Sequence, residues 1–62
     1  MKILNLVVSR RVMRGTVNVE GARYYAPALE ARHGEALAVI VRGDGSAFAD
    51  LDSRPLELER IA

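Results

Sequence analysis

The architecture of this chain can be predicted from one segment, Gly15-Thr-Val-Asn-Val-Glu-Gly-Ala-Arg-Tyr-Tyr-Ala-Pro-Ala-Leu-Glu-Ala-Arg-His-Gly34. Val17 and Val19 alternate with polar neighbours, which is typical of a half-buried β-strand. Gly21 accepts positive φ without steric cost, so a tight reversal is expected at Glu20-Gly21. Tyr24 and its neighbours then favour a second strand, because aromatic side chains suit a pleated surface. The segment therefore begins with a β-hairpin.

The second half of the segment leaves the sheet. Pro27 stops the ladder because proline lacks the N–H that a central strand donates. We expect one short helical turn near residues 28–33, ending at Gly34. His33 lies at the end of this turn, where the helix dipole favours a cation, but the position favours an ordinary capping or surface histidine over a functional one. No second metal ligand and no nucleophile stands at a recognisable spacing from His33.

Both sides of the hairpin can be assigned from strand alternation. Val17, Val19 and Tyr24 form the predicted inner face, and Arg23 and Tyr25 fall on the opposite face. Tyr25 beside Arg23 suits stacking on a base or ribose, or ordinary packing of the ring along the arginine stem. Of these two roles, the sequence favours ordinary packing.

The residues before the hairpin comprise an apolar predicted strand and a segment rich in arginine. Ile3 to Val8 is predicted to be a strand that is apolar on both faces, so it needs cover on both sides or a subunit contact. In Ser9 to Arg14, an extended backbone would place Arg10, Val12 and Arg14 on one face. These arginines could discourage unwanted strand pairing or could contact phosphates.

The residues after the hairpin predict three more strands separated by turns. Glu35 to Arg42 is the strongest, with Leu37, Val39 and Val41 on one face. It is followed by a turn at Gly43-Asp44-Gly45. The later elements are a weaker strand at residues 47–51, a turn at residues 52–55, and residues 56–61, where alternation favours strand and composition also allows helix. Leu56 and Leu58 would point inward.

Together these elements predict an all-β chain that forms one domain over residues 1–62. The architecture expected is a small antiparallel β-barrel of five or six strands with one short helical turn. The interior of so small a barrel is filled by side chains, which leaves no room for a buried active site. The acidic residues are scattered and are expected to be exposed, so we expect no enzyme activity.

The amino-acid composition argues against several kinds of site and several classes of protein. The chain has no cysteine and one histidine, so a disulfide or a structural zinc site is not expected, and no cofactor is implied. Half of the residues are hydrophobic, which is too apolar for a disordered chain. No stretch approaches the roughly 20 successive apolar residues of a membrane span, and no signal peptide is recognisable. We expect a cytoplasmic protein without membrane contact.

The net charge of +1 conceals an asymmetry. Residues 1–42 hold seven basic and three acidic residues, a net charge of +4, whereas residues 43–62 hold two basic and five acidic residues, a net charge of −3. Every basic residue except Lys2 is arginine, whose planar guanidinium suits phosphate and carboxylate alike. A basic and an acidic side permit anion binding or head-to-tail self-association.

The same residues also resemble a known family, the small β-barrel domain near the C-terminus of phage Mu-type transposases. That family shows an Arg-x-x-x-Arg-Gly-x-Val run, an acid-Gly turn, a Tyr, a Pro-x-Leu and a Gly-Glu before a Val-rich strand. The matching positions are Arg10, Arg14-Gly15, Val17, Glu20-Gly21, Tyr24, Pro27-Ala28-Leu29 and Gly34-Glu35. After Arg42 the chain departs from the family, because a shorter segment with different turns replaces the usual Asp-Pro loop and aromatic strand.

The resemblance implies an accessory role. Transposases of this kind cut and join DNA with three metal-binding carboxylates in a separate ribonuclease-H-like domain, and nothing of that domain is present in this sequence. The barrel is implied to contact DNA and neighbouring subunits of a transposition complex. Phosphate contacts through arginine would fit, since they position a protein without specifying a base sequence.

We therefore expect a non-catalytic module that binds the backbone of nucleic acid, DNA above all, without sequence preference. The expected contact residues are Lys2, Arg10, Arg11, Arg14, Arg23, Tyr25 and Arg32. The alternative is a protein–protein interaction module that self-associates and does not bind nucleic acid. The apolar first strand and the charge asymmetry favour this alternative, and a homo-oligomer or a larger transposition complex is compatible with both.

Overall fold

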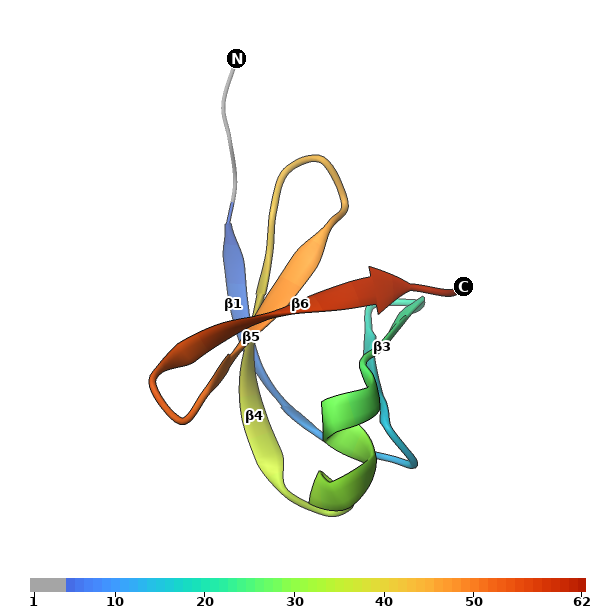
Figure 1. Cartoon of the computed structure of the whole chain (residues 1–62). Coiled ribbons are helices and arrows are strands. Elements are labelled where there is room, and N and C mark those ends of the chain that lie inside the picture. Colours follow the sequence, from blue (N-terminus) through green and yellow to red (C-terminus); the bar gives the residue numbers. More distant parts are fainter. Residues whose placement is uncertain (1–4) are drawn as a thin grey trace.

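A computed structural model of the chain describes residues 5–62 and confirms the predicted small β-barrel (Figure 1). Six strands and one 3-10 helix, η1, make up the fold. In chain order they are β1 (Leu6–Arg11), β2 (Thr16–Val19), β3 (Ala22–Tyr25), η1 (Pro27–Arg32), β4 (Ala36–Val41), β5 (Ala47–Leu51) and β6 (Arg54–Arg60). Among the described residues no helix is long and apolar enough to cross a membrane.

All six strands belong to one antiparallel sheet with the order β1-β4-β5-β6-β3-β2. The sheet curls so far that its two edge strands approach each other, and the barrel is nearly closed. β1 and β2 meet at an isolated bridge between Met13 and Thr16. β3 and β6 share two residue pairs, Tyr24 with Arg60 and Tyr25 with Glu59, and the contact continues beyond β6 through backbone hydrogen bonds that join Arg23 to Ile61 and Ala62.

The core lies inside the curl and is built by strand alternation. Buried hydrophobic residues come from every strand except β1, with Val12 following β1 and Leu29 contributed by η1. Within residues 5–62 the buried hydrophobic residues are Val12, Val17, Val19, Tyr24, Ala26, Leu29, Leu37, Val39, Ala47, Ala49 and Leu58. Of the six residues expected on the inner face of the hairpin and on one face of residues 35–42, five are buried and Val41 is partly buried. The prediction of the hairpin's inner face is thus confirmed.

Tyr24 is the largest fully buried side chain, with 2% of its surface exposed. Its hydroxyl donates a hydrogen bond of 2.9 Å to the carbonyl oxygen of Gly45, in the turn between β4 and β5. A buried hydroxyl without a partner would be costly, so this bond allows the whole tyrosine to enter the core. It also ties the β2–β3 hairpin to the other half of the sheet.

Three two-residue turns have positive φ at both central residues, which is the backbone that right-handed strand twist favours in tight hairpins. They are Arg14-Gly15, Glu20-Gly21 and Asp52-Ser53. The turn at Glu20-Gly21 was expected. Arg14-Gly15 forms a complete turn, closed by two backbone hydrogen bonds between Met13 and Thr16. The backbone is therefore not extended at Arg14, and Arg14 does not continue the face that Arg10 and Val12 would share.

Several predicted boundaries also change. The first strand was expected at Ile3 to Val8, but β1 spans Leu6–Arg11, and Ile3 and Leu4 lie outside the described residues. The predicted four-residue turn at 52–55 is shorter, because Arg54 and Pro55 already pair with β5. The final segment is a strand, as favoured, with Leu58 buried and Leu56 partly buried on the inner face.

On the outer face, one arginine links three neighbouring strands. Arg42 follows β4, its guanidinium stacks 4.6 Å from the ring centroid of Phe48 in β5, and it forms a bidentate pair with Glu57 in β6. The Nη2–Oε2 distance is 2.6 Å. This hydrogen bond holds the pKa of the Glu57 carboxyl below its usual value, although burial acts in the opposite direction. In the adjacent turn, donation from Ser46 likewise lowers the pKa of Asp44.

The turn between β5 and β6 generates a prediction about stability. Ser53 holds φ of 64° without the conformational freedom of glycine. Changing Ser53→Gly should raise the free energy of unfolding by about 0.5–1 kcal/mol, since relief of left-handed strain exceeds the added entropy of the unfolded chain. Chemical denaturation measures this change. A loss of stability would contradict the strained turn.

A second prediction compares two glycines that both have positive φ. A Cβ added at Gly15 would lie 2.8 Å from Cγ of Glu30 and 3.2 Å from Cε1 of Tyr25, whereas one added at Gly21 would meet nothing within 4 Å. Gly15→Ala should therefore destabilise the chain by about 1 kcal/mol more than Gly21→Ala. Equal losses in thermal or chemical denaturation would show that the crowding around Gly15 is unimportant.

A third prediction concerns acid stability. A carboxyl whose pKa is lowered by folding stabilises the folded state above its ordinary pKa, here 4.5, and loses that contribution as pH falls through the lowered value. The stability advantage of the natural chain over the Glu57→Gln variant should thus shrink as pH falls below 4.5. Unfolding curves at a series of pH values test this. A difference that stays constant from neutral to acid pH would contradict the pairing with Arg42.

Candidate nucleic-acid interface

The arginines divide into those paired with carboxylates and those that are not. Within residues 5–62 the ion pairs are Arg32–Glu35 at 3.2 Å, Arg32–Asp52 at 2.7 Å and Arg42–Glu57 at 2.6 Å. Arg32, one of the expected contact residues, is thus engaged by two carboxylates at once. Its charge is largely balanced on the protein, so it is less available to a phosphate than the sequence suggested.

Arg11 and Arg14 are exposed and have no carboxylate partner in the part of the chain that the structure describes. Nη1 of Arg11 donates a hydrogen bond to the carbonyl oxygen of Gly34. The backbone N–H of Arg14 donates to Nδ1 of His33 at 2.9 Å. Both contacts tie the end of β1 and its turn to the residues that follow η1.

The contact with His33 also decides which ring nitrogen carries the proton. Nδ1 accepts a hydrogen bond from the amide of Arg14, so the neutral imidazole must be protonated on Nε2. His33 is exposed, which leaves the Nε2–H able to donate to a bound group. The ring therefore fixes the turn on one side and presents a donor on the other.

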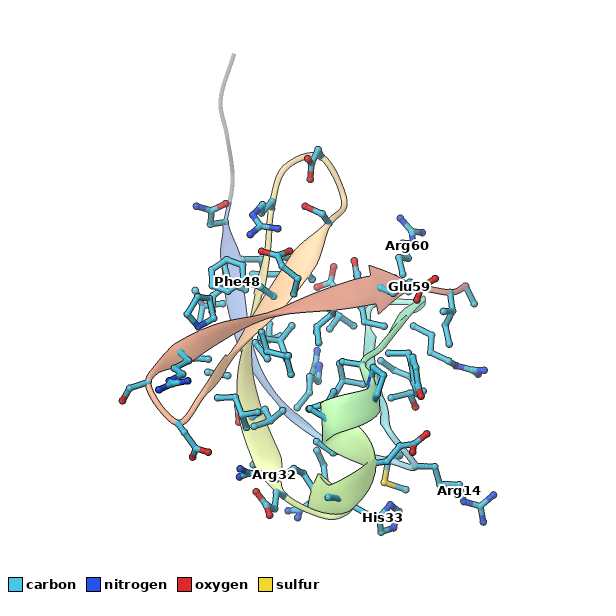
Figure 2. All side chains as sticks on the ribbon, viewed as in Figure 1. Arg14, Arg32, His33, Phe48, Glu59 and Arg60 are labelled. Carbon is cyan, nitrogen blue, oxygen red and sulfur yellow. The ribbon has the colours of Figure 1, made fainter. Side chains whose placement is uncertain are left out.

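These contacts gather cationic and donor side chains at one end of the barrel, which we call the basic end and define as Arg11, Arg14, Arg32 and His33. Figure 2 shows Arg14, His33 and Arg32 along the lower end of the molecule, with Arg14 directed away from the ribbon. Arg60 lies higher in the same view, near the end of β6. The basic end has one neutralised cation and two cations without a carboxylate partner.

The other expected arginines lie elsewhere. Arg10 shares the inner side of β1 with the core residue Val12, and its Nε is buried without a hydrogen-bond partner among the described residues. Arg23 is exposed and pairs with Asn18, toward the Glu20-Gly21 turn at the far end of the hairpin. Lys2 lies outside the described residues. The structure thus brings together only Arg11, Arg14 and Arg32 of the expected set.

Tyr25 has a structural contact of its own. Its hydroxyl donates to Oε2 of Glu30 at 2.9 Å, and this hydrogen bond raises the pKa of the Tyr25 hydroxyl. As expected, Tyr25 lies on the face opposite the buried Tyr24. The ring passes close to Gly15, so Tyr25 holds η1 and the Arg14-Gly15 turn together. Its stacking on a nucleic-acid base stays a prediction.

His33 was not among the expected contact residues. Its position before Gly34 predicts a helix end, but its bond to Arg14 joins residues 19 positions apart and depends on how the barrel closes. Within residues 5–62 there is no group of three or more His, Asp or Glu side chains that could hold a metal ion. The arrangement supports anion contact through donors and positive charge.

Comparison with known proteins adds an independent finding. Searches of curated proteins and of solved structures each gave no match. A family model described as "Mu transposase, C-terminal" matches residues 4–47, which is more than two thirds of the chain. The match includes β1 to β4, η1 and the turns between them, and it ends where β5 begins. This chain therefore belongs to the Mu transposase C-terminal domain family.

Proposed function

We propose that this domain is a non-catalytic module that contacts the DNA backbone through its basic end. Membership of a transposase domain family supports DNA as the partner. The observation that carries the proposal is the placement of two arginines without carboxylate partners at one end of the barrel. Arg11 and Arg14 lie together without a carboxylate within residues 5–62, and His33 beside them offers a free ring N–H.

Such a surface suits phosphate and not base recognition. Arg14 stands on a tight turn and Arg11 at the end of a strand, so neither belongs to a helix or ribbon shaped to enter the major groove. Guanidinium groups and ring N–H donors on turns contact phosphate oxygens, which fix orientation without reporting sequence. We infer weak binding without sequence preference, in which the domain supports DNA contacts made elsewhere in a larger complex.

Contacts of the other expected residues with DNA stay predictions. Arg10 and Arg23 would extend the contact beyond the basic end, whereas Arg32 would contribute only by exchanging a carboxylate for a phosphate. Lys2 and Tyr25 stay in the predicted set. No catalytic role is proposed, because the described residues contain no carboxylate cluster suited to the metal-dependent chemistry of transposition.

Titration of labelled duplex DNA at several salt concentrations tests the proposal. Affinity should fall with a slope of roughly 0.9 log units per phosphate contact for each log unit of salt. The Arg11→Gln/Arg14→Gln variant should therefore bind several-fold more weakly and show a slope reduced by about two contacts. Arg14→Gln alone should reduce the slope by about one.

Arg60→Gln is the matched control for Arg14→Gln, since each removes one exposed arginine and Arg60 lies at the end of β6 beside the Gly45 turn, away from the basic end. It should leave the affinity and slope close to those of the natural chain. Salt-independent binding would contradict backbone contact altogether. Equal effects of Arg14→Gln and Arg60→Gln would contradict its location at the basic end.

A further inference from the structure

β1 is an edge strand whose outer backbone groups are unpaired. Val12, which continues the line of β1, bonds through both its N–H and C=O to residues 35 and 34 on the β4 side, at 2.8 and 2.9 Å. Backbone groups alternate sides along an antiparallel strand. Hence the N–H and C=O groups of Val7, Ser9 and Arg11 face away from β4, and within residues 5–62 they have no backbone partner.

The first half of this edge lacks the usual protection against pairing. Leu6 and Val7 are large apolar residues with 42% and 62% of their surfaces exposed. Residues 5–9 carry no charge, whereas charged side chains are the common means of blocking an edge strand. The other edge, β2, has only four residues and lies between two tight turns. The start of β1 is therefore the more accessible edge of the sheet (Figure 1).

We propose that this edge pairs with β1 of a second copy of the chain, in antiparallel orientation about a two-fold axis at Val7. Two copies would then form one continuous sheet across the interface. Val7 would face Val7 of the partner subunit, and Leu6 would lie opposite Val8 of the partner subunit. Main-chain hydrogen bonds would hold the two strands together, and contacts between the apolar side chains would determine the register.

The distribution of charge along β1 favours a second copy as the occupant. Apolar residues lie at the start of the strand and arginines at its end, so an antiparallel copy brings the apolar halves together. The two Arg11 Cα atoms would stand about 26 Å apart, from eight residues at roughly 3.3 Å each. That separation exceeds the screening length of about 8 Å at physiological salt. The interface is thus self-complementary, as a two-fold contact requires.

An acidic peptide is the less suitable occupant. Over residues 5–9 the edge has no cation to attract a carboxylate, and Nη1 of Arg11 is already bonded to Gly34. Arg10 turns toward the core side of the strand, with its Nε buried. The proposal does not depend on DNA binding, since no residue from 5 to 9 belongs to the basic end.

Sedimentation equilibrium of the chain without DNA, from micromolar to millimolar concentration, tests the pairing. The natural chain should pass from monomer to dimer across this range. Val7→Lys should weaken the dimer by at least roughly tenfold, a change of about 1.4 kcal/mol, by placing two charges face to face. Ile61→Lys is the control, because Ile61 is also apolar and 49% exposed but lies beyond β6.

A backbone variant separates edge pairing from contact between side chains. Ser9→Pro removes an N–H that faces outward, so the bonds between β1 and β4 stay intact while addition of a strand is blocked. This variant should remain folded by circular dichroism and should be monomeric. Val8→Pro removes an inward bond to β4 and should instead destabilise the monomer.

Three results would overturn the proposal. One is a natural chain that stays monomeric up to millimolar concentration. Another is a dimer that Ile61→Lys weakens as much as Val7→Lys does, which would place the contact elsewhere. The third is a folded Ser9→Pro variant that dimerises as strongly as the natural chain, which would exclude main-chain pairing at this edge.

Discussion

The burial of Tyr24 is the constraint on which the rest of the structure depends. A sheet of six short strands must curl tightly to enclose a core, and the β3–β6 junction that joins its two halves is short, with two residue pairs and two further backbone hydrogen bonds at Arg23. Tyr24 lies at this junction, fills the interior, and reaches across it to bond the carbonyl of Gly45. One side chain thereby joins the hairpin to the β4–β5 turn, and its polar atom does not oppose its own burial.

The curl of the sheet, which Tyr24 supports, also determines which arginines are paired with carboxylates. Sheet register places Arg42 above Phe48 and beside Glu57, so its charge is used on the protein. Barrel closure brings the Arg14-Gly15 turn against the residues after η1, where His33 accepts the amide of Arg14. The cations without a carboxylate partner at that end are consequently a product of the fold and not of a local sequence motif. The unpaired edge of β1 at Val7 is also a result of the fold. Within residues 5–62, β2 is bridged to this part of the chain only at Met13, after the end of β1, so it does not cover the start of that strand.

Much of the fold could be predicted because its signals are local. Alternation fixed the inner faces of the hairpin and of β4, and Glu20-Gly21 and Gly43-Asp44-Gly45 marked their own turns. The turn at Asp52-Ser53 was predicted to span four residues instead of two. Its positive φ angles could not be predicted because neither residue is glycine. The site was harder to predict. The carboxylates on Arg32 and the contact between Arg14 and His33 join distant parts of the chain, so only tertiary structure could sort the arginines.

The account holds that positive charge free to meet a phosphate is concentrated where the Arg14-Gly15 turn meets the end of η1. Mapping backbone amide shifts of the isotopically labelled chain, by nuclear magnetic resonance during titration with duplex DNA, tests this most directly. The account predicts that the largest shifts fall on residues 11–15 and 32–35, with little change along β6. Largest shifts on β6 or at the Glu20-Gly21 turn, or no shifts at saturating DNA, would contradict it.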